Sequence, residues 1–208
     1  SEVVHLPRCN KALFVFQQLV STDISERLDI RSSSSTKILF LVRKNIAGRS
    51  DRWSNAEACF EALKTSSNES IVRINPTEHL PSEIAKLVCN TKITITAAGS
   101  AAYNSLLLGN QNHFTVLIVP YSVNCASIWK LTLRMFIPFS HKLILISSQN
   151  APSPSLKAWD SNISINPLHL SVEILTLLNY SQMRNLGYPD ISKRRVYKNS
   201  SLVINLPS

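Results

Sequence analysis

The side chains best suited to bind an anionic group are four cations in one short segment. They are Arg43, Lys44, Arg49 and Arg52, and Trp53 follows directly. An apolar run precedes this segment and a helix-start pattern follows it. Guanidinium groups beside the free amides of a helix start favour the same anion, so the segment predicts a phosphate-binding loop. It carries neither a glycine-rich dinucleotide fingerprint nor a P-loop motif, and a solvated basic loop is the alternative.

A second candidate segment is made almost entirely of small residues. Residues 97–104 read Ala-Ala-Gly-Ser-Ala-Ala-Tyr-Asn. Side chains of this size let a phosphate or a ligand backbone approach closely, and Ser100 can donate a hydrogen bond. The same residues also suit a tight strand-to-helix junction that binds nothing. In that case Gly99→Val would destabilise the fold by about 1–3 kcal/mol through strain or overpacking.

A third group of cations lies near the end of the chain, beside Tyr197. Its members are Lys193, Arg194, Arg195 and Lys198. Because these charges repel one another, we expect the group not to pack on the domain without an anionic partner. Contacts with RNA phosphates would be strongly salt-dependent, and Arg and Tyr side chains can stack on unpaired bases. The alternative is a solubilising end.

The sequence contains no spacing typical of a catalytic or metal site. The five histidines are isolated, and no two of the four cysteines have the short spacing of a metal or redox motif. Buried free thiols are therefore expected. Residues 91–150 contain no Asp or Glu, which removes the usual general bases from the second candidate segment. We therefore predict no catalytic residue, metal or cofactor. Trp53, Trp129 and Trp159 are expected to pack or to close over a site.

These segments are separated by short apolar runs and by patterns of helical period. A continuous apolar run, typical of a parallel strand covered on both faces, lies within 37–43, and further short β-rich runs predict strands at 70–74, 92–96, 114–119 and 142–146. Helices are expected within the first 30 residues and then from Ser54, Pro81, residue 101, Asn124 and Asn166. The first of the later helices has a capping-box spacing from Ser54 to Glu57. This alternation predicts an α/β fold, Rossmann-like, with a mostly parallel sheet flanked by helices.

We divide the chain into a helical lead-in (1–36), a Rossmann-like domain (37–180) and a basic irregular tail (181–208) with a short strand near 202–204. The longest aliphatic runs fall far short of a membrane-spanning helix. The chain starts at Ser1, so either a targeting segment has been removed or this is part of a longer protein. The net charge of +9 predicts an anionic partner, with solubility as the alternative.

Several of these segments resemble, in the same order, glycosyltransferase family 61. Leu41-Val-Arg43, Arg49 and Asn55-Ala-Glu57 are similar to its Ser-Arg strand end, arginine loop and Asn-Glu-x-Glu helix start. Residues 80–87 resemble the segment before its key turn, and 96–104 fall where the family has a His-Gly-Ala-Gly-Leu-Thr-Asn type motif. The resemblance spans residues 10–180 and includes 106–109, 116–120 and 166–168.

The resemblance implies the donor-binding half of a two-domain transferase of the GT-B type. It would place five residues near the diphosphate of a nucleotide sugar: Arg43, Arg49, Gly99, Ser100 and Asn104. The family's histidine is Ala98 here and one of its glycines is Ala101, which predicts weak or undetectable affinity for UDP-sugars. The acceptor-side domain is not among these 208 residues, and orienting two substrates is much of catalysis.

Two functions follow. The first is a catalytically inactive, glycosyltransferase-like subunit of a larger protein or ribonucleoprotein assembly, with an acidic protein or RNA as partner. An organellar ribosome is the leading candidate, which would place the protein in the mitochondrion. The second is the donor-binding half of an active family 61-like transferase that uses a nucleotide sugar, in the secretory pathway. The sequence favours the first.

Overall fold

The computed structural model describes Asp23, Glu26 and residues 37–43, 53–97, 99, 101–102, 104–105, 113–119, 142–147, 163–185 and 201–205. For 142–147, 180–185 and 201–205 the description covers the backbone. Apart from Asp23 and Glu26, which are helical, the helix expected within the first 30 residues lies outside this part of the chain. The helix expected from Asn124 and the connection at 148–162 also lie outside it.

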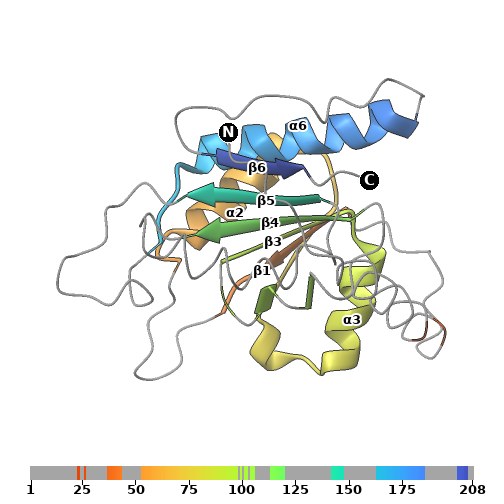
Figure 1. Ribbon diagram of the computed structural model, residues 1–208. Coiled ribbons are helices and arrows are strands. Elements are labelled where there is room, and N and C mark those ends of the chain that lie inside the picture. Colours follow the sequence, from red (N-terminus) through yellow and green to blue (C-terminus); the bar gives the residue numbers. More distant parts are fainter. Residues whose placement is uncertain are drawn as a thin grey trace, which may run out of the picture.

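The centre of the domain is one six-stranded sheet (Figure 1). Its strands are β1 (Ile38–Leu41), β2 (Ile71–Ile74), β3 (Ile93–Ala97), β4 (Phe114–Val119), β5 (Lys142–Ser147) and β6 (Ser201–Asn205). They lie in the order β2-β1-β3-β4-β5-β6. Neighbouring strands from β2 to β5 are parallel, and β6 is antiparallel to β5. All five predicted parallel strands are therefore present at the expected positions.

Helices cover both faces of the sheet, because β1 is apolar on both faces and buries every side chain. Ile38 and Phe40 belong to the core beneath α2 (Ala56–Ser66) and α6 (Pro167–Asn185). Leu39 and Leu41 pack with α3 (Pro81–Asn90) on the opposite face. Figure 1 shows this arrangement, with α2 and α6 on one side of the sheet and α3 on the other. The predicted Rossmann-like α/β fold is confirmed.

Regular structure continues past residue 180, into the segment expected to be an irregular tail. Helix α6 reaches Asn185, beyond its expected end near Leu178. The short strand expected near 202–204 is present as β6 and pairs with β5. The cations at 193–198, which were expected not to pack on the domain, lie outside the described residues. The Leu-Val-Ile sequence of β6 has high β-propensity and adds to the edge of the sheet that β5 would otherwise leave open.

Within the described part of the chain, no helix combines the length and the apolar character needed to cross a membrane.

Candidate functional site

The strand order identifies where a ligand can enter the carboxyl edge of the sheet. From β1 the chain moves to β2 on one side and then returns to β3 on the other side of β1. In open α/β sheets, ligands bind at such a reversal, beyond the carboxyl ends of the two strands. The reversal here lies between β1 and β3, where Leu41 is the register partner of Thr96. The two loops predicted from sequence follow these two strands, so the fold brings their first residues together.

The chain leaves these two strands towards opposite faces of the sheet, as it does on either side of the ligand-binding crevice of open α/β sheets. The loop after β1 leads to α2, on the face of Ile38 and Phe40. The helical residues after β3 lie on the other face, because Ser105 Oγ is 2.7 Å from Thr115 Oγ1. Thr115 alternates with Phe114 and Val116, which face α2 and α6.

Three of the predicted phosphate-binding residues are described. Arg43 directly follows Val42 at the end of β1, and its side chain is exposed. Gly99 and Asn104 follow β3 and are half-buried. Arg49, Arg52 and Ser100 lie outside the described residues. The cations at 193–198 also lie outside them, but β6, which follows them, begins opposite Ile146 near the carboxyl end of β5.

The small residues after β3 have a packing role as well. Ala101 and Ala102 are buried, as the tight-junction interpretation requires. At Gly99, however, the nearest described atom to an added Cβ would be the Ala97 backbone oxygen at 3.9 Å, an ordinary contact. The described structure therefore does not supply the crowding that was expected to penalise Gly99→Val.

The capping box predicted at the start of α2 is wrong. Asn55 is the N-cap residue, and its side chain makes no capping hydrogen bond. The Ser54 backbone N–H and Oγ both donate to the Ile163 carbonyl, at 2.9 and 3.1 Å. The Glu57 carboxylate pairs with Arg73 on β2 and does not reach back to Ser54. Each polar group of the expected box therefore has a partner distant in sequence.

Long-range contacts fix the start of α2. Trp53 is 1% exposed, stacks on Phe40 with ring centroids 4.9 Å apart, and forms a parallel bridge with Ile163. Trp53 is thus a packing residue, one of the two roles expected for it. One turn into the helix, burial raises the pKa of the Cys59 thiol to about 12, and a hydrogen bond with Trp53 offsets this only in part. Cys59 is therefore a buried, protonated free thiol, as predicted.

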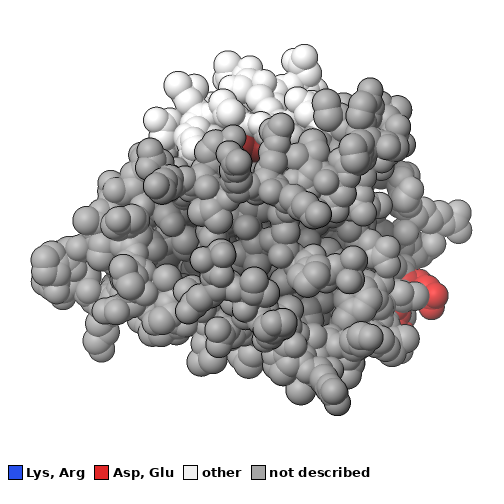
Figure 2. Space-filling model, turned by 45° about the horizontal axis from the view of Figure 1, so that its top comes forward, with Lys and Arg blue, Asp and Glu red and all other residues white. Residues whose placement is uncertain are grey.

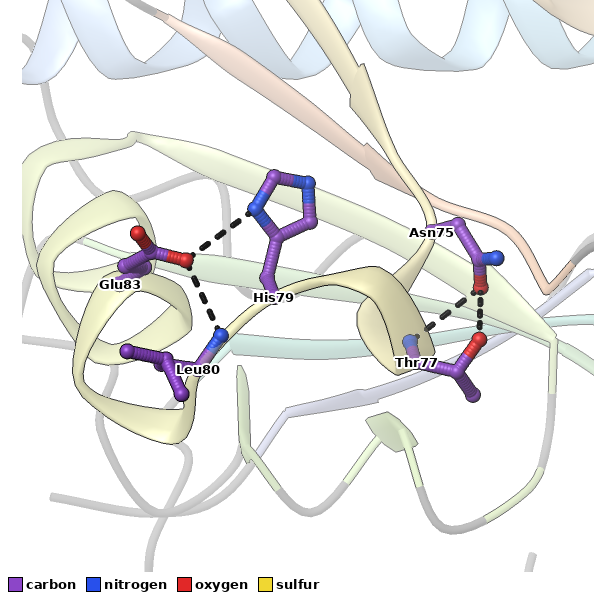
Figure 3. A network of polar contacts seen from close by, with 5 residues as sticks. All are labelled: Asn75, Thr77, His79, Leu80 and Glu83. Atoms are coloured by element: carbon purple, nitrogen blue, oxygen red, sulfur yellow. Dashed lines mark hydrogen bonds and ion pairs between the residues drawn. The ribbon is translucent and has the colours of Figure 1, made fainter.

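Local contacts fix the start of α3 (Figure 3). The Asn75 carboxamide oxygen, at the end of β2, accepts hydrogen bonds from the Thr77 N–H and hydroxyl at 3.3 and 2.9 Å. These bonds shape the short 3-10 helix η1 (Pro76–Glu78). The Glu83 carboxylate accepts from the Leu80 N–H at 3.0 Å and lies 3.4 Å from His79 Nδ1. A carboxylate therefore occupies this helix start.

The two helix starts consequently differ in whether their first amides are already paired with a carboxylate. At α3 the Glu83 carboxylate already interacts with the positive end of the helix and repels a phosphate. At α2 the amides of Glu57 and Ala58 have no acceptor among the described residues, and the Glu57 carboxylate is paired with Arg73. Arg43 emerges from β1, just before the loop to this helix. Of the two, the start of α2 is the one suited to bind phosphate.

A buried histidine lies far from this edge. His113 immediately precedes β4, at the amino end of the sheet, and its Nδ1 and Nε2 lie 3.0 Å from the Thr91 carbonyl and 3.1 Å from Ser105 Oγ. The Ser–His contact is buried and lies away from the carboxyl edge of the sheet, where it packs the interior of the domain. Sequence reasoning missed it because Ser105 and His113 carry no motif.

The described side chains of α6, from 167 to 179, include no Lys or Arg. Figure 2 shows no Lys or Arg among the described side chains on this view, and Glu173 is the one Asp or Glu over residues 167–179. In the described part of the chain, no three His, Cys, Asp or Glu side chains gather to hold a metal ion.

Comparison with known proteins places these features in a family. The model of the family described as glycosyltransferase 61 matches residues 3–118, more than half of the chain. The matched region contains both candidate loops, α2, α3 and most of β4, and ends before α6. A search of curated proteins finds no match. The chain belongs to glycosyltransferase family 61.

Proposed function

We propose that this chain binds the nucleotide diphosphate of a sugar donor at the carboxyl edge of its sheet, in the crevice between the loops that follow β1 and β3. The donor-binding half of a family 61 transferase was the second of the two functions derived from the sequence. The fold now favours it over a purely structural subunit. The observation that carries this proposal is the strand order, because it brings both predicted loops to one topological switch point.

The charges of the described residues support binding of a diphosphate. Beyond β1 lies Arg43, and the residues described directly beyond β3 are small or neutral: Gly99, Ala101, Ala102 and Asn104. None of these described residues carries a carboxylate that would repel an anion. The start of α2 adds backbone amides with no described acceptor. A guanidinium group and helix amides bind a phosphate jointly.

The same described residues contain no base, which argues against sugar transfer by this site alone. Proton abstraction from an acceptor hydroxyl needs a base such as a carboxylate or an imidazole. Arg43 and the described residues 99–104 supply neither, the Glu57 carboxylate at the start of α2 is paired with Arg73, and Ala98 replaces the histidine of the resembled motif. We therefore propose a domain that binds the donor weakly and relies on groups outside this crevice for any transfer.

Calorimetric titration with UDP tests the proposal. We expect weak binding that Arg43→Ala weakens by about tenfold, the equivalent of about 1.4 kcal/mol for one charge-assisted contact. Lys64→Ala is the matched control, because Lys64 is an exposed cation in the last turn of α2, at the opposite end of that helix. Equal losses in both variants would indicate a nonspecific effect of net charge. No UDP binding by the native chain would refute the proposal.

The net charge of +9 was also interpreted as the mark of an RNA-bound subunit. The same protein can be titrated with structured RNA at two salt concentrations. Tight binding with a steep salt dependence, together with no UDP binding, would favour the subunit. UDP binding with weak, nonspecific RNA association would favour the donor site.

A further inference from the structure

We propose that Asn55 is a positioning residue of this site: its carboxamide ties the start of α2 to residues 163–165 and so holds the first-turn amides where the donor phosphates bind. The inference rests on the proposed function and adds to it a segment outside the family match. Residues 163–165 lie well beyond residue 118, where that match ends.

The tie is a paired hydrogen bond between one side chain and one backbone residue. Asn55 Nδ2 donates to the Ile165 carbonyl at 2.7 Å, and Asn55 Oδ1 accepts from the Ile165 N–H at 3.3 Å. The carboxamide thus bonds to both the carbonyl and the N–H of Ile165, as the backbone of a neighbouring β-strand would. Two opposed bonds fix both the distance and the orientation of the N-cap residue.

The partner segment is firmly anchored. Ile163 and Ile165 are both buried in the core that also contains Leu170 and Ile174 of α6. The backbone N–H of Ser54 and the thiol of Cys59 donate to the same short segment, to the carbonyls of Ile163 and Ile165 respectively. The start of α2 is therefore held against a fixed part of the core.

The side chain of Asn55 could have capped its own helix, since Asn is among the best N-cap residues. It instead makes no capping bond and leaves the amides of Glu57 and Ala58 without an acceptor among the described residues. A helix start that is held in place without its own cap keeps those amides available to a ligand. The Asn55–Ile165 bonds, together with the missing cap, therefore favour a role in positioning the amides over a role in stabilising the helix alone.

The test compares three variants for UDP affinity, thermal stability and hydrogen exchange at residues 56–58. Asn55→Ala removes the tie, and we expect UDP to bind about fivefold to tenfold more weakly, with faster exchange. Thr65→Ala is the matched control, because the Thr65 hydroxyl donates to the Glu61 carbonyl at the far end of α2 and does not contact residues 163–165. We expect its UDP affinity to stay within about twofold of the native value.

Asn55→Ser separates positioning from stability. Serine can cap the helix locally but cannot reach Ile165 in the same way, so it should recover stability and still bind UDP more weakly. Recovery of both stability and affinity would show that Asn55 only stabilises the helix and would overturn the inference. If Asn55→Ala does not fold, Asn55→Ser still tests the inference.

The inference and the proposed function fail in distinguishable ways. If the native chain binds UDP and Asn55→Ala and Asn55→Ser bind it equally well, only the inference is wrong. If the native chain does not bind UDP, both are wrong.

Discussion

The starts of α2 and α3 lie at the same edge of the sheet, because each helix follows a parallel strand, yet they are held in opposite ways. At α3, Glu83 accepts from Leu80 and lies beside His79, and Asn75 accepts from Thr77, so these partners are within four residues in sequence. At α2, Ser54 and Asn55 bond to Ile163 and Ile165, which are 109 and 110 residues away.

This difference shows that the sequence spacing of a capping box does not decide whether the capping hydrogen bonds form. Ser54 to Glu57 has the spacing of a capping box but forms none, whereas Leu80 lacks a polar side chain and its N–H is still bound by Glu83. A helix start whose polar side chains are used elsewhere keeps its amides for a ligand. A helix start capped by a carboxylate does not.

The largest expected effect comes from removing the anchor of the α2 start. Trp53→Ala deletes a fully buried ring stacked on Phe40 and should lower the free energy of unfolding by about 3–5 kcal/mol. In urea denaturation, Leu80→Ala at the start of α3 should change it by less than about 0.5 kcal/mol, because Leu80 is 65% exposed. Similar losses of unfolding free energy in the two variants would show that the starts of α2 and α3 do not differ in how strongly they are anchored.

A smaller effect is expected at the start of α3. Glu83→Ala removes the acceptor of the Leu80 N–H and should cost about 1 kcal/mol, measured by thermal unfolding. Glu83→Gln is the control, because a glutamine oxygen can accept the same hydrogen bond. If the glutamine variant lost as much stability as the alanine variant, the charge and not the hydrogen bond would be responsible.

The pair between Arg73 and Glu57 should matter less. Both side chains are partly exposed, and the Arg73 guanidinium also lies 5.7 Å from the centre of the Phe60 ring. Arg73→Ala should therefore lower the free energy of unfolding by no more than about 1 kcal/mol. The difference in stability between the native chain and this variant should become smaller in high salt. A much larger loss would mean that α2 depends on β2 as strongly as on residues 163–165.

The smallest effect at neutral pH concerns Cys59, which is protonated there in both folded and unfolded chains. In the folded protein its pKa is raised from 9.0 to about 12. The unfolded thiol therefore ionises first, and this contribution to the free energy of unfolding is lost as the pH rises from about 9 towards 12. Thermal melts of Cys59→Ala across this range should fall less steeply than those of the native chain. Parallel curves would contradict the burial of this thiol.

The strands were predictable from the sequence because their signal is local. The run Ile38–Leu41 is apolar at every position, and Phe114–Val119 is apolar at every position except Thr115, which marks strands covered on both faces. The helix starting at Pro81 was predicted as well, from proline at its first turn and the buried stripe of Ile84 and Val88. The candidate loops could be proposed because cations and small residues stand directly after two of these strands.

The partners of the polar side chains could not be predicted in the same way. Nothing near Asn55 indicates that its carboxamide will bind residue 165, and nothing near Ser105 indicates a contact with His113. The run at 202–204 predicted a strand but not its antiparallel pairing with β5, which closes the edge of the sheet.

The sequence by itself therefore determined the fold class, the positions of the strands and the candidate segments for binding an anion, since composition and periodicity are properties of neighbouring residues. Only the tertiary structure decided that the loops after β1 and β3 meet, and that the start of α2 is tied to residues 163–165. The physical reason is that strand order and long-range hydrogen bonds arise when buried faces pack together, and packing selects partners without regard to their separation along the chain.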